Sequence, residues 1–243
     1  NDVAYHSDKI SRKYDNLINI LGADHTGYIK RITAAVSALS NKKVKLNCKV
    51  CQLVKLYKKG KPFKMSKRAG DFISVQDLLS EVNKDSIRFM MLNRSNDVEL
   101  DFDFDKVREK TKDNPVYYVQ YAYARINSIA RTLKINLDDE ISIDRKTFSP
   151  NEYEKKILRK IFEWPKIVES ASHKFEPHKI PFYLYELSTI FHSYWSKGNE
   201  NAEFRFIENG LIKKPETLAF INLVAVVIKN GMKILGVSLP DKM

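Results

Sequence analysis

The residues best suited to chemistry form a basic segment, Lys64-Met65-Ser66-Lys67-Arg68, with a glycine close on each side. Glycine edges predict a loop that can close over a ligand, and its lysines can neutralise a triphosphate. When a carboxylate attacks the α-phosphorus of ATP, negative charge builds on the equatorial and leaving oxygens, where ammonium groups favour the transition state. The alternative is a solvated basic loop or a localisation patch. A Met inside a Lys-Met-Ser-Lys core favours the chemical interpretation.

A second group of polar residues, 22–25, follows a short apolar run at residues 17–21. An apolar run that ends at a glycine is typical of a buried parallel strand. Residues 28–39 have helical spacing of apolar side chains, and residues 44–57 alternate as a strand does. This strand–helix–strand order predicts part of a parallel α/β sheet, whose ligands lie beyond the carboxyl ends of its strands. Residues 22–25 are expected at such an end.

The second half of the chain has the periodicity of helices. Ser74 to Asp77 predict a capping box, another helix is expected to begin at Asp85, and Asn114-Pro115 marks a break. Beyond it, apolar side chains at helical spacing predict helices from residue 115 and near 152–172, 181–196 and 216–235, with a loop at 138–151. We therefore expect an all-α bundle.

Aromatic residues on the first of these helices suit the recognition of unstacked bases. Tyr118 and Tyr121 lie about one turn apart, with Arg125 nearby. The alternative is a core role, which the apolar stripe favours for Tyr118. Tyr194 and Trp195 belong to a second aromatic cluster, in which we expect Trp195 to be core.

Charge and composition bound the class of partner. A net charge of +12 and a pI near 9.5 indicate a polyanion, nucleic acid or an anionic membrane surface, although scattered lysines would give the same total. The longest apolar run, residues 218–228, is too short for a bilayer, so we expect no membrane span. Cys48 and Cys51 have no further ligands near them for zinc and are expected to be reduced structural thiols. No metal site is predicted.

The basic segment resembles the KMSKS-type motif of class I aminoacyl-tRNA synthetases, and its continuation AGDFISVQDLL (69–79) is similar to that of the arginyl-tRNA synthetase family. Four further blocks resemble that family in the same order: DVAYH (2–6), NILGADHTGYI (19–29), NPVYYVQYAYAR (114–125) and NGMKILGV (230–237). Thr26 and Tyr123 depart from the family's usual histidines. The HIGH motif, which forms the other half of the ATP site, is absent from this chain.

The resemblance implies a bacterial-type arginine–tRNA ligase, of which this chain would be the C-terminal half. Residues 1–113 would be the C-terminal part of a class I Rossmann-type α/β catalytic domain with the KMSKR loop. Residues 114–243 would be a DALR-type all-α anticodon-binding domain. The enzyme would activate arginine with ATP and transfer it to tRNA(Arg), with Mg²⁺ held by the ATP phosphates. We expect a cytoplasmic monomer.

Site residues follow from the same resemblance, position by position. Asp2 would bind the guanidinium of arginine, since a carboxylate accepts a forked pair of hydrogen bonds. Gly22 and Asp24 would contact the ribose of ATP. His25 would either line the same pocket or be a structural residue. The ATP-binding set is Gly22, Asp24, His25 and Met65, the catalytic set is Lys67, Lys64 and Ser66, and the tRNA-binding set is Tyr118, Tyr121, Arg125, Tyr194 and Met243.

Two other interpretations stay open at this point. As it stands, the chain would bind tRNA without catalysing synthesis, because half of the ATP site is missing. Another class I enzyme, such as the cysteine-specific one, shares the KMSK motif and a DALR-like bundle. It is disfavoured by the arginine-type blocks at 22–31 and 114–125 and by the lack of a zinc-ligand set.

Overall fold

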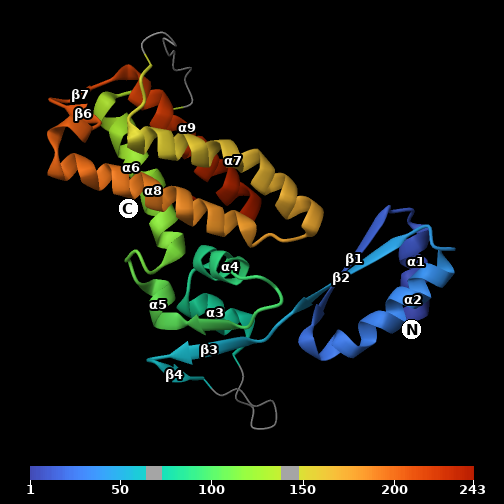
Figure 1. Cartoon of the computed structure of the whole chain (residues 1–243). Coiled ribbons are helices and arrows are strands. Elements are labelled where there is room, and N and C mark those ends of the chain that lie inside the picture. Colours follow the sequence, from blue (N-terminus) through green and yellow to red (C-terminus); the bar gives the residue numbers. More distant parts are fainter. Residues whose placement is uncertain (64–72, 138–147) are drawn as a thin grey trace. The chain divides into compact units, whose positions relative to one another are not determined.

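A computed structural model describes residues 1–63, 73–137 and 148–243. The basic segment with Lys64, Met65, Ser66 and Lys67, and most of the loop predicted at 138–151, lie outside these ranges. The chain forms two compact units, one of residues 1–56 and 94–102 and one of residues 57–93 and 103–243 (Figure 1). The division predicted at residues 113 and 114 follows motif similarity rather than packing and stays a prediction.

The first unit is built on two parallel strands. Helix α1 (Asp2–Ser11) precedes β1 (Asn16–Gly22), a short 3₁₀ helix η1 (Ala23–Tyr28), α2 (Ile29–Leu39) and β2 (Lys45–Cys51). The register runs from Asn16 opposite Lys45 to Gly22 opposite Cys51. Alternating apolar side chains of the strands meet the apolar stripe of α2 in a core of Leu17, Ile32, Val36 and Leu46. The predicted strand–helix–strand order is confirmed.

The single strand predicted at 44–57 is two strands. β2 ends at Cys51, and β3 (Val54–Lys58) joins a separate sheet of order β4-β3-β5, with β4 (Lys61–Pro62) and β5 (Leu100–Asp103). The chain changes partner between them, where the Gln52 amide donates to the Asn96 carbonyl at 2.8 Å. Alternation of apolar residues continues through both strands, so periodicity alone did not reveal the break.

Short capped helices follow in the second unit. α3 (Val75–Glu81) begins with the predicted capping box, in which Ser74 and Asp77 satisfy each other's amides. α4 (Lys84–Leu92) starts one residue earlier than expected because the Asn83 side chain caps the Ser86 amide. Asp103 caps α5 (Phe104–Arg108) in the same way.

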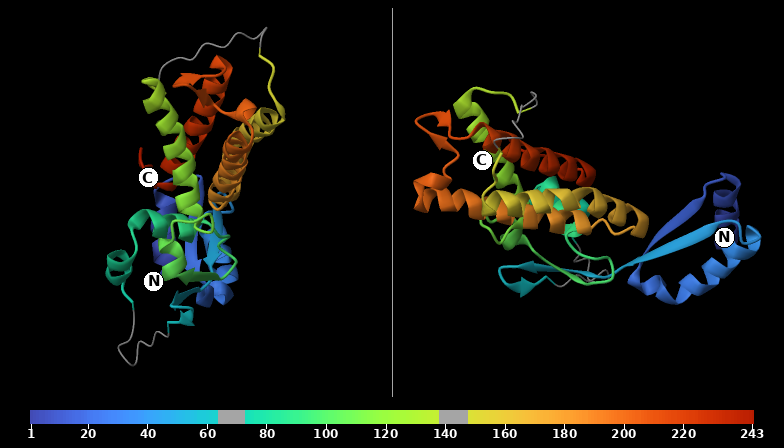
Figure 2. Two further views of the ribbon diagram at one scale, coloured as in Figure 1. Left: turned by 90° about the vertical axis from the view of Figure 1, so that its left-hand side faces the viewer. Right: turned by 45° about the horizontal axis from the view of Figure 1, so that its top comes forward.

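Four long helices form the bundle: α6 (Pro115–Leu133), α7 (Glu152–Lys174), α8 (Lys179–Glu200) and α9 (Pro215–Leu235). Pro115 and Pro215 occupy first-turn positions that need no amide hydrogen, which sets where α6 and α9 begin. A turn η2 (Ala202–Phe204) and the hairpin β6 (Ile207–Glu208) and β7 (Leu211–Ile212) connect α8 to α9. Figure 2 shows α7 and α8 side by side, and α9 packs against both of them and against α6. The predicted helices and the all-α character of this part are confirmed.

Helix α9 is the core helix of the bundle. It is the one described helix long and apolar enough to cross a bilayer, with a mean hydropathy of 1.7 in its most apolar window, yet 56% of that window is buried. Its approach to α8 depends on Gly231, where a Cβ would lie 2.7 Å from a methyl group of Leu184. Burial against the other helices explains its composition.

Candidate functional sites

An open hollow of about 720 Å³ lies in the first unit, beside β1 and η1. Its lining includes the predicted Asp2, Asp24 and His25, together with polar side chains from α1, β1 and η1. α1 contributes Asp2 from its first turn, and η1 contributes Asp24 and His25 directly after the carboxyl end of β1. The structure thus brings together three of the four described residues that were predicted for small ligands, and the fourth, Gly22, ends the strand beside them.

Asp2 lies beside the buried hydroxyl of Tyr28. Among the described residues this hydroxyl makes no hydrogen bond of good geometry, and the Asp2 carboxylate is the acceptor that interacts with it. Burial, and after it this interaction with Asp2, raises the pKa of Tyr28. A buried polar atom without a partner costs free energy on the order of 1–3 kcal/mol. A polar ligand beside Asp2 would remove this cost.

Gly22 leaves room for the side chain of Asp24. A Cβ at position 22 would lie 2.6 Å from Asp24 Oδ1, closer than two unbonded atoms can approach. The carboxylate of Asp24 is itself 82% exposed, and His25 Nε2 lies 3.7 Å from its Oδ2. An exposed carboxylate whose position depends on a glycine is available to accept hydroxyl hydrogen bonds.

If Gly22 and Asp24 meet the ribose of ATP, as the resemblance implies, replacing Gly22 by Ala should raise the KM for ATP several-fold in the product of the full open reading frame. The added methyl displaces the Asp24 carboxylate, but stability should change little because Asp24 is exposed and the backbone at Gly22 is ordinary extended chain, with φ −71° and ψ 162°. Gly27→Ala is the matched control, since its Cβ would meet nothing within 4 Å. Steady-state kinetics and thermal melts measure both. Equal KM values for ATP in the two variants would contradict the role of Gly22.

Two polar residues of this hollow, His6 and Asn19, were not singled out from the sequence. Both are buried, and their side chains are hydrogen-bonded to each other at 2.9 Å. The spacing of Asp2 and His6 on one helix face, and the inward position of Asn19 between Leu17 and Leu21 on β1, were available signals. Neither signal reveals the contact, because it depends on how α1 packs on β1.

A second candidate site is an aromatic and cationic row on α6 in the bundle. Tyr117 stacks on Tyr121 with ring centroids 5.7 Å apart, and the Arg125 guanidinium lies 4.2 Å from the Tyr121 ring centroid. Arg125 also lies 5.0 Å from the ring centroid of Trp195 on α8. These four residues, which we call the aromatic row, are half-buried and alternate flat rings with a flat cation. Such surfaces suit stacking by single-stranded bases.

His192 of α8 anchors the aromatic row from beneath. Its Nε2–H donates to the Tyr118 carbonyl at 3.0 Å, so Nδ1 is free to accept from Arg125 Nη1 at 2.9 Å. Arg125 also donates to the Tyr121 hydroxyl at 3.1 Å. Burial, assisted by the Arg125 charge, lowers the pKa of His192 to about 4. A neutral imidazole is what lets the guanidinium lie against it.

The stability of the bundle should therefore fall with acid between about pH 6.5 and pH 4. In this pH range His192 is protonated in the unfolded chain but stays neutral in the folded chain, because the folded structure lowers its pKa to about 4. Protons therefore favour unfolding, and the stability present above pH 6.5 is lost as the pH falls towards 4. Urea denaturation of the chain at pH 7 and pH 4.5 measures the loss. In His192→Gln the difference between the two pH values should be smaller. An equal difference in both proteins would contradict this origin.

The other residues predicted to contact tRNA lie in different surroundings. Tyr118 is half-buried and packs on His192 and Tyr185, and burial raises the pKa of its phenol. Met243 is 49% exposed at the end of the chain. Tyr194 is 3% exposed, and its hydroxyl donates to Glu154 and accepts from Asn151. Its ring lies in the core of the bundle, so this burial does not favour the contact with tRNA, which stays a prediction.

Trp195 departs from expectation in the opposite direction. Predicted as core, it is half-buried and lines a hollow of about 260 Å³ with Ser128, Thr132, Asn199, Phe204 and Arg205. The hollow adjoins the Arg125 end of the aromatic row. Sequence spacing could not reveal it, because η2 folds back on α8 to complete its wall.

Comparisons with known proteins agree with these observations. Residues 119–243 match the family model of the DALR anticodon binding domain. The chain is 60% identical over 242 residues to an arginine–tRNA ligase of Pelagibacter ubique and 49% identical over 247 residues to one of Ruegeria pomeroyi. Each match covers the whole chain and 42% of the relative, so the chain spans less than half the length of these relatives.

Solved structures share the fold. A Campylobacter jejuni structure with 32% identity has a TM-score of 0.85 over the whole chain and 51% of its own length. Thermus thermophilus arginyl-tRNA synthetase, at 20% identity, has a TM-score of 0.69 over 95% of the chain and 42% of its own length, and shows the fold alone. The resemblance to arginyl-tRNA synthetases inferred from the motifs is confirmed, and the match to more than half of its residues shows that the chain belongs to the DALR anticodon-binding domain family.

Proposed function

We propose that the protein is an arginine–tRNA ligase, which activates arginine with ATP to arginyl-adenylate and transfers it to tRNA(Arg). This chain would contribute the KMSKR segment, part of the substrate pocket and the anticodon-binding bundle. Residues 1–113, with the parallel β1–α2–β2 unit, would belong to a class I Rossmann-type catalytic domain, and residues 114–243 would form the anticodon-binding domain. The protein would act as a monomer in the cytoplasm.

The observation that carries the proposal is the composition of the hollow in the first unit. An anionic side chain, Asp2, lies beside the buried Tyr28 hydroxyl, and these two oxygen-bearing groups suit a guanidinium that carries several N–H donors. Asp24 offers a carboxylate next to a glycine, which suits the hydroxyls of a ribose. One hollow therefore holds acceptors for the two substrates whose reaction forms an adenylate.

ATP fits the residues that are described. Gly22 and Asp24 would hold its ribose, His25 would line the same pocket, and Lys64, Met65, Ser66 and Lys67 are assigned to its phosphates by motif similarity. Mg²⁺ would accompany these phosphates and withdraw charge from them. Within residues 1–63, 73–137 and 148–243 no cluster of three or more His, Cys, Asp and Glu side chains could hold a metal ion. We therefore assign no protein ligands to the Mg²⁺ ion.

The bundle would bind the anticodon stem-loop of tRNA(Arg) through the aromatic row. Tyr121 and Arg125 are the predicted residues that lie in this row, and Trp195 extends it. The net charge of +12 supplies the long-range attraction for an RNA partner. Tyr118 would support Tyr121 through their shared neighbour His192.

Pyrophosphate exchange by the product of the full open reading frame tests this function. We expect ATP formation that depends on arginine, with lysine in place of arginine as the control amino acid and tRNA(Arg) present throughout. Charging of tRNA(Arg) with labelled arginine tests the second step. Exchange with another amino acid but not with arginine would overturn the proposal.

A further inference from the structure

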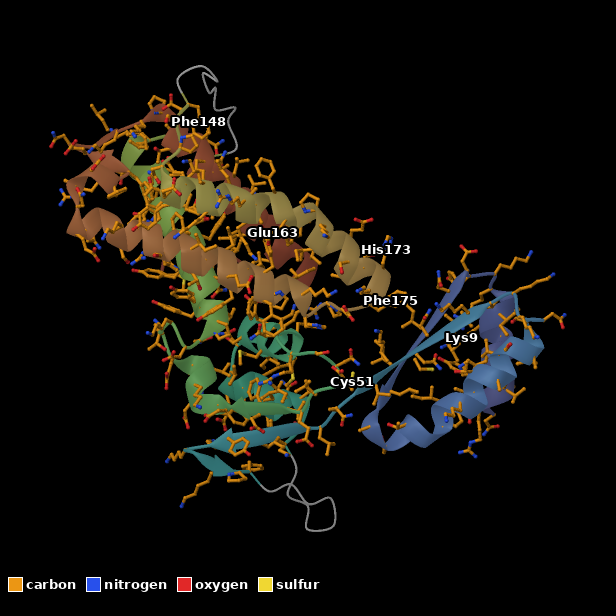
Figure 3. The ribbon with its side chains drawn as sticks, viewed as in Figure 1. Lys9, Cys51, Phe148, Glu163, His173 and Phe175 are labelled. Carbon is orange, nitrogen blue, oxygen red and sulfur yellow. The ribbon has the colours of Figure 1, made fainter. Side chains whose placement is uncertain are left out.

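A buried line of hydrogen bonds crosses from α1 to β1 behind Asp2. His6 Nδ1 contacts the Asp2 carbonyl at 2.8 Å, His6 Nε2 contacts Asn19 Nδ2 at 2.9 Å, and Asn19 Oδ1 contacts Lys9 Nζ at 2.9 Å. His6 and Asn19 are 3% and 8% exposed. We call these three side chains, His6, Asn19 and Lys9, the relay. Figure 3 labels Lys9, which lies on the side of α1 that faces the strands.

The chemistry of its two ends fixes every proton in the relay. The Asp2 carbonyl can only accept, so His6 Nδ1 carries the ring proton and donates it. The Lys9 ammonium can only donate, so the Asn19 oxygen accepts from it and the Asn19 amide donates to His6 Nε2. Each donor in the relay therefore faces an acceptor, so only one arrangement of the hydrogen atoms is possible.

The relay supports the part of α1 that most needs support. The first turn of α1 receives no side-chain cap from Asn1, and the Asp2 side chain is exposed to the hollow. Helix ends open more readily than helix centres. His6 ties the Asp2 carbonyl to a buried strand residue, whose position is set by the pairing of Asn19 with Cys48.

The relay also keeps a cation away from Asp2. Lys9 lies seven residues after Asp2 on the same face of α1 and lines the same hollow. Its ammonium is held by Asn19 and lies 4.5 Å from the Tyr5 ring centroid. Without Asn19, this ammonium would be released beside the carboxylate and would compete with a cationic ligand.

We propose that the His6–Asn19–Lys9 relay is a positioning device for Asp2, which presents this carboxylate, free of the Lys9 ammonium, to the guanidinium of the substrate. The inference rests on the proposed function, in which Asp2 binds arginine. Asn19 is its central member, because its side chain is hydrogen-bonded to both His6 and Lys9. The relay acts on arginine through Asp2 and leaves ATP binding and the chemical step unchanged.

A double-mutant cycle in the product of the full open reading frame tests the proposal. The variants are Asn19→Ala, Asp2→Asn and the two combined, measured by arginine-dependent pyrophosphate exchange with tRNA(Arg) present. Loss of the hydrogen bonds at Asn19 should raise the KM for arginine about five- to tenfold, with kcat and the KM for ATP unchanged. In the Asp2→Asn background the same substitution should have no further effect on this KM.

The matched control is Asn47→Ala, an asparagine of the neighbouring strand β2 that does not line the hollow. Thermal melts compare it with Asn19→Ala. If Asn19→Ala fails to fold, His6→Phe keeps an aromatic ring at this position and removes the hydrogen bonds to the Asp2 carbonyl and to Asn19, so it should raise the KM for arginine about two- to threefold. An unchanged KM for arginine in His6→Phe would overturn the proposal.

The outcomes separate the inference from the proposed function. A KM for arginine that is unchanged in Asn19→Ala, or raised equally with and without Asp2, would overturn the positioning role. A KM that is unchanged in Asp2→Asn would instead remove the arginine site itself, and with it the basis of the proposed function. A rise in both single variants that is not multiplied in the double variant supports the relay.

Discussion

Replacing Asp2 by Asn should raise the KM for arginine about 10- to 150-fold in the product of the full open reading frame. Hydrogen bonds to a charged group contribute roughly 1.5–3 kcal/mol, and each 1.4 kcal/mol is a factor of ten in affinity. Asparagine keeps the size of the side chain but removes the negative charge and one of the two acceptors that a guanidinium fork requires. The KM for ATP should stay near its original value, because Asp24 and not Asp2 is assigned to the nucleotide.

Asp8→Asn is the matched control for this substitution. Asp8 lies on the same helix, is exposed, and already pairs with Arg12 at 3.0 Å. An exposed pair of this kind contributes about 0–1 kcal/mol, and Asp8 does not line the hollow. Equal KM values for arginine in Asp2→Asn and the unmodified protein would show that another residue binds the guanidinium.

Local rules predicted most of the helices of this chain, although not α1 and α5, because the boundaries of the predicted helices depend on neighbouring residues. The capping box at Ser74 and Asp77 and the first-turn Pro115 need no distant partner to take effect. The apolar periodicity of α9 likewise identified a buried helix. The break between β2 and β3 was missed because it depends on a distant residue, Asn96, that receives the Gln52 amide.

The candidate sites divide in the same way. Asp2 and Asp24 belong to different elements, α1 and η1, and motif similarity predicted both as ligand-binding residues. The structure shows that both line one hollow. The burial of Tyr194 and Trp195 on α8 depends on the segment that follows this helix. Phe206 packs edge-on against Tyr194 at 4.8 Å and against Trp195 at 5.7 Å, and of these two residues only Trp195 also lines the hollow of about 260 Å³.

The relay and His192 could not be predicted from spacing. Each uses a histidine in which a ring nitrogen meets a side chain from another element of the chain, Asn19 for His6 and Arg125 for His192. A lone histidine in a sequence is most often a structural residue, and here both are structural. Each histidine holds a functional group in place: His6 holds the turn that carries the Asp2 carboxylate, and His192 holds the Arg125 guanidinium.

Replacing Tyr121 by Ala should weaken binding of arginine tRNA by the 243-residue chain by roughly 1–3 kcal/mol, the usual contribution of one stacked base. Tyr121 is the centre of the aromatic row: its ring contacts Tyr117 and the Arg125 guanidinium, and its hydroxyl accepts from Arg125. Tyr121→Phe keeps the ring and loses only this hydroxyl, so its affinity should stay close to that of the unmodified chain. Filter binding against tRNA(Arg) measures all three proteins.

Two further measurements separate stacking from simple attraction between charges. Affinity should fall steeply with added salt in every variant, because lysine and arginine contacts to phosphates release counterions. The loss at Tyr121→Ala should persist at both low and high salt, since stacking involves no counterion. Tyr123→Ala, two residues along α6 and outside the aromatic row, should bind as the unmodified chain does. If both alanine variants bind equally well, or if a tRNA with an unrelated anticodon binds as tightly as tRNA(Arg), the bundle attracts RNA by charge alone and does not recognise the anticodon.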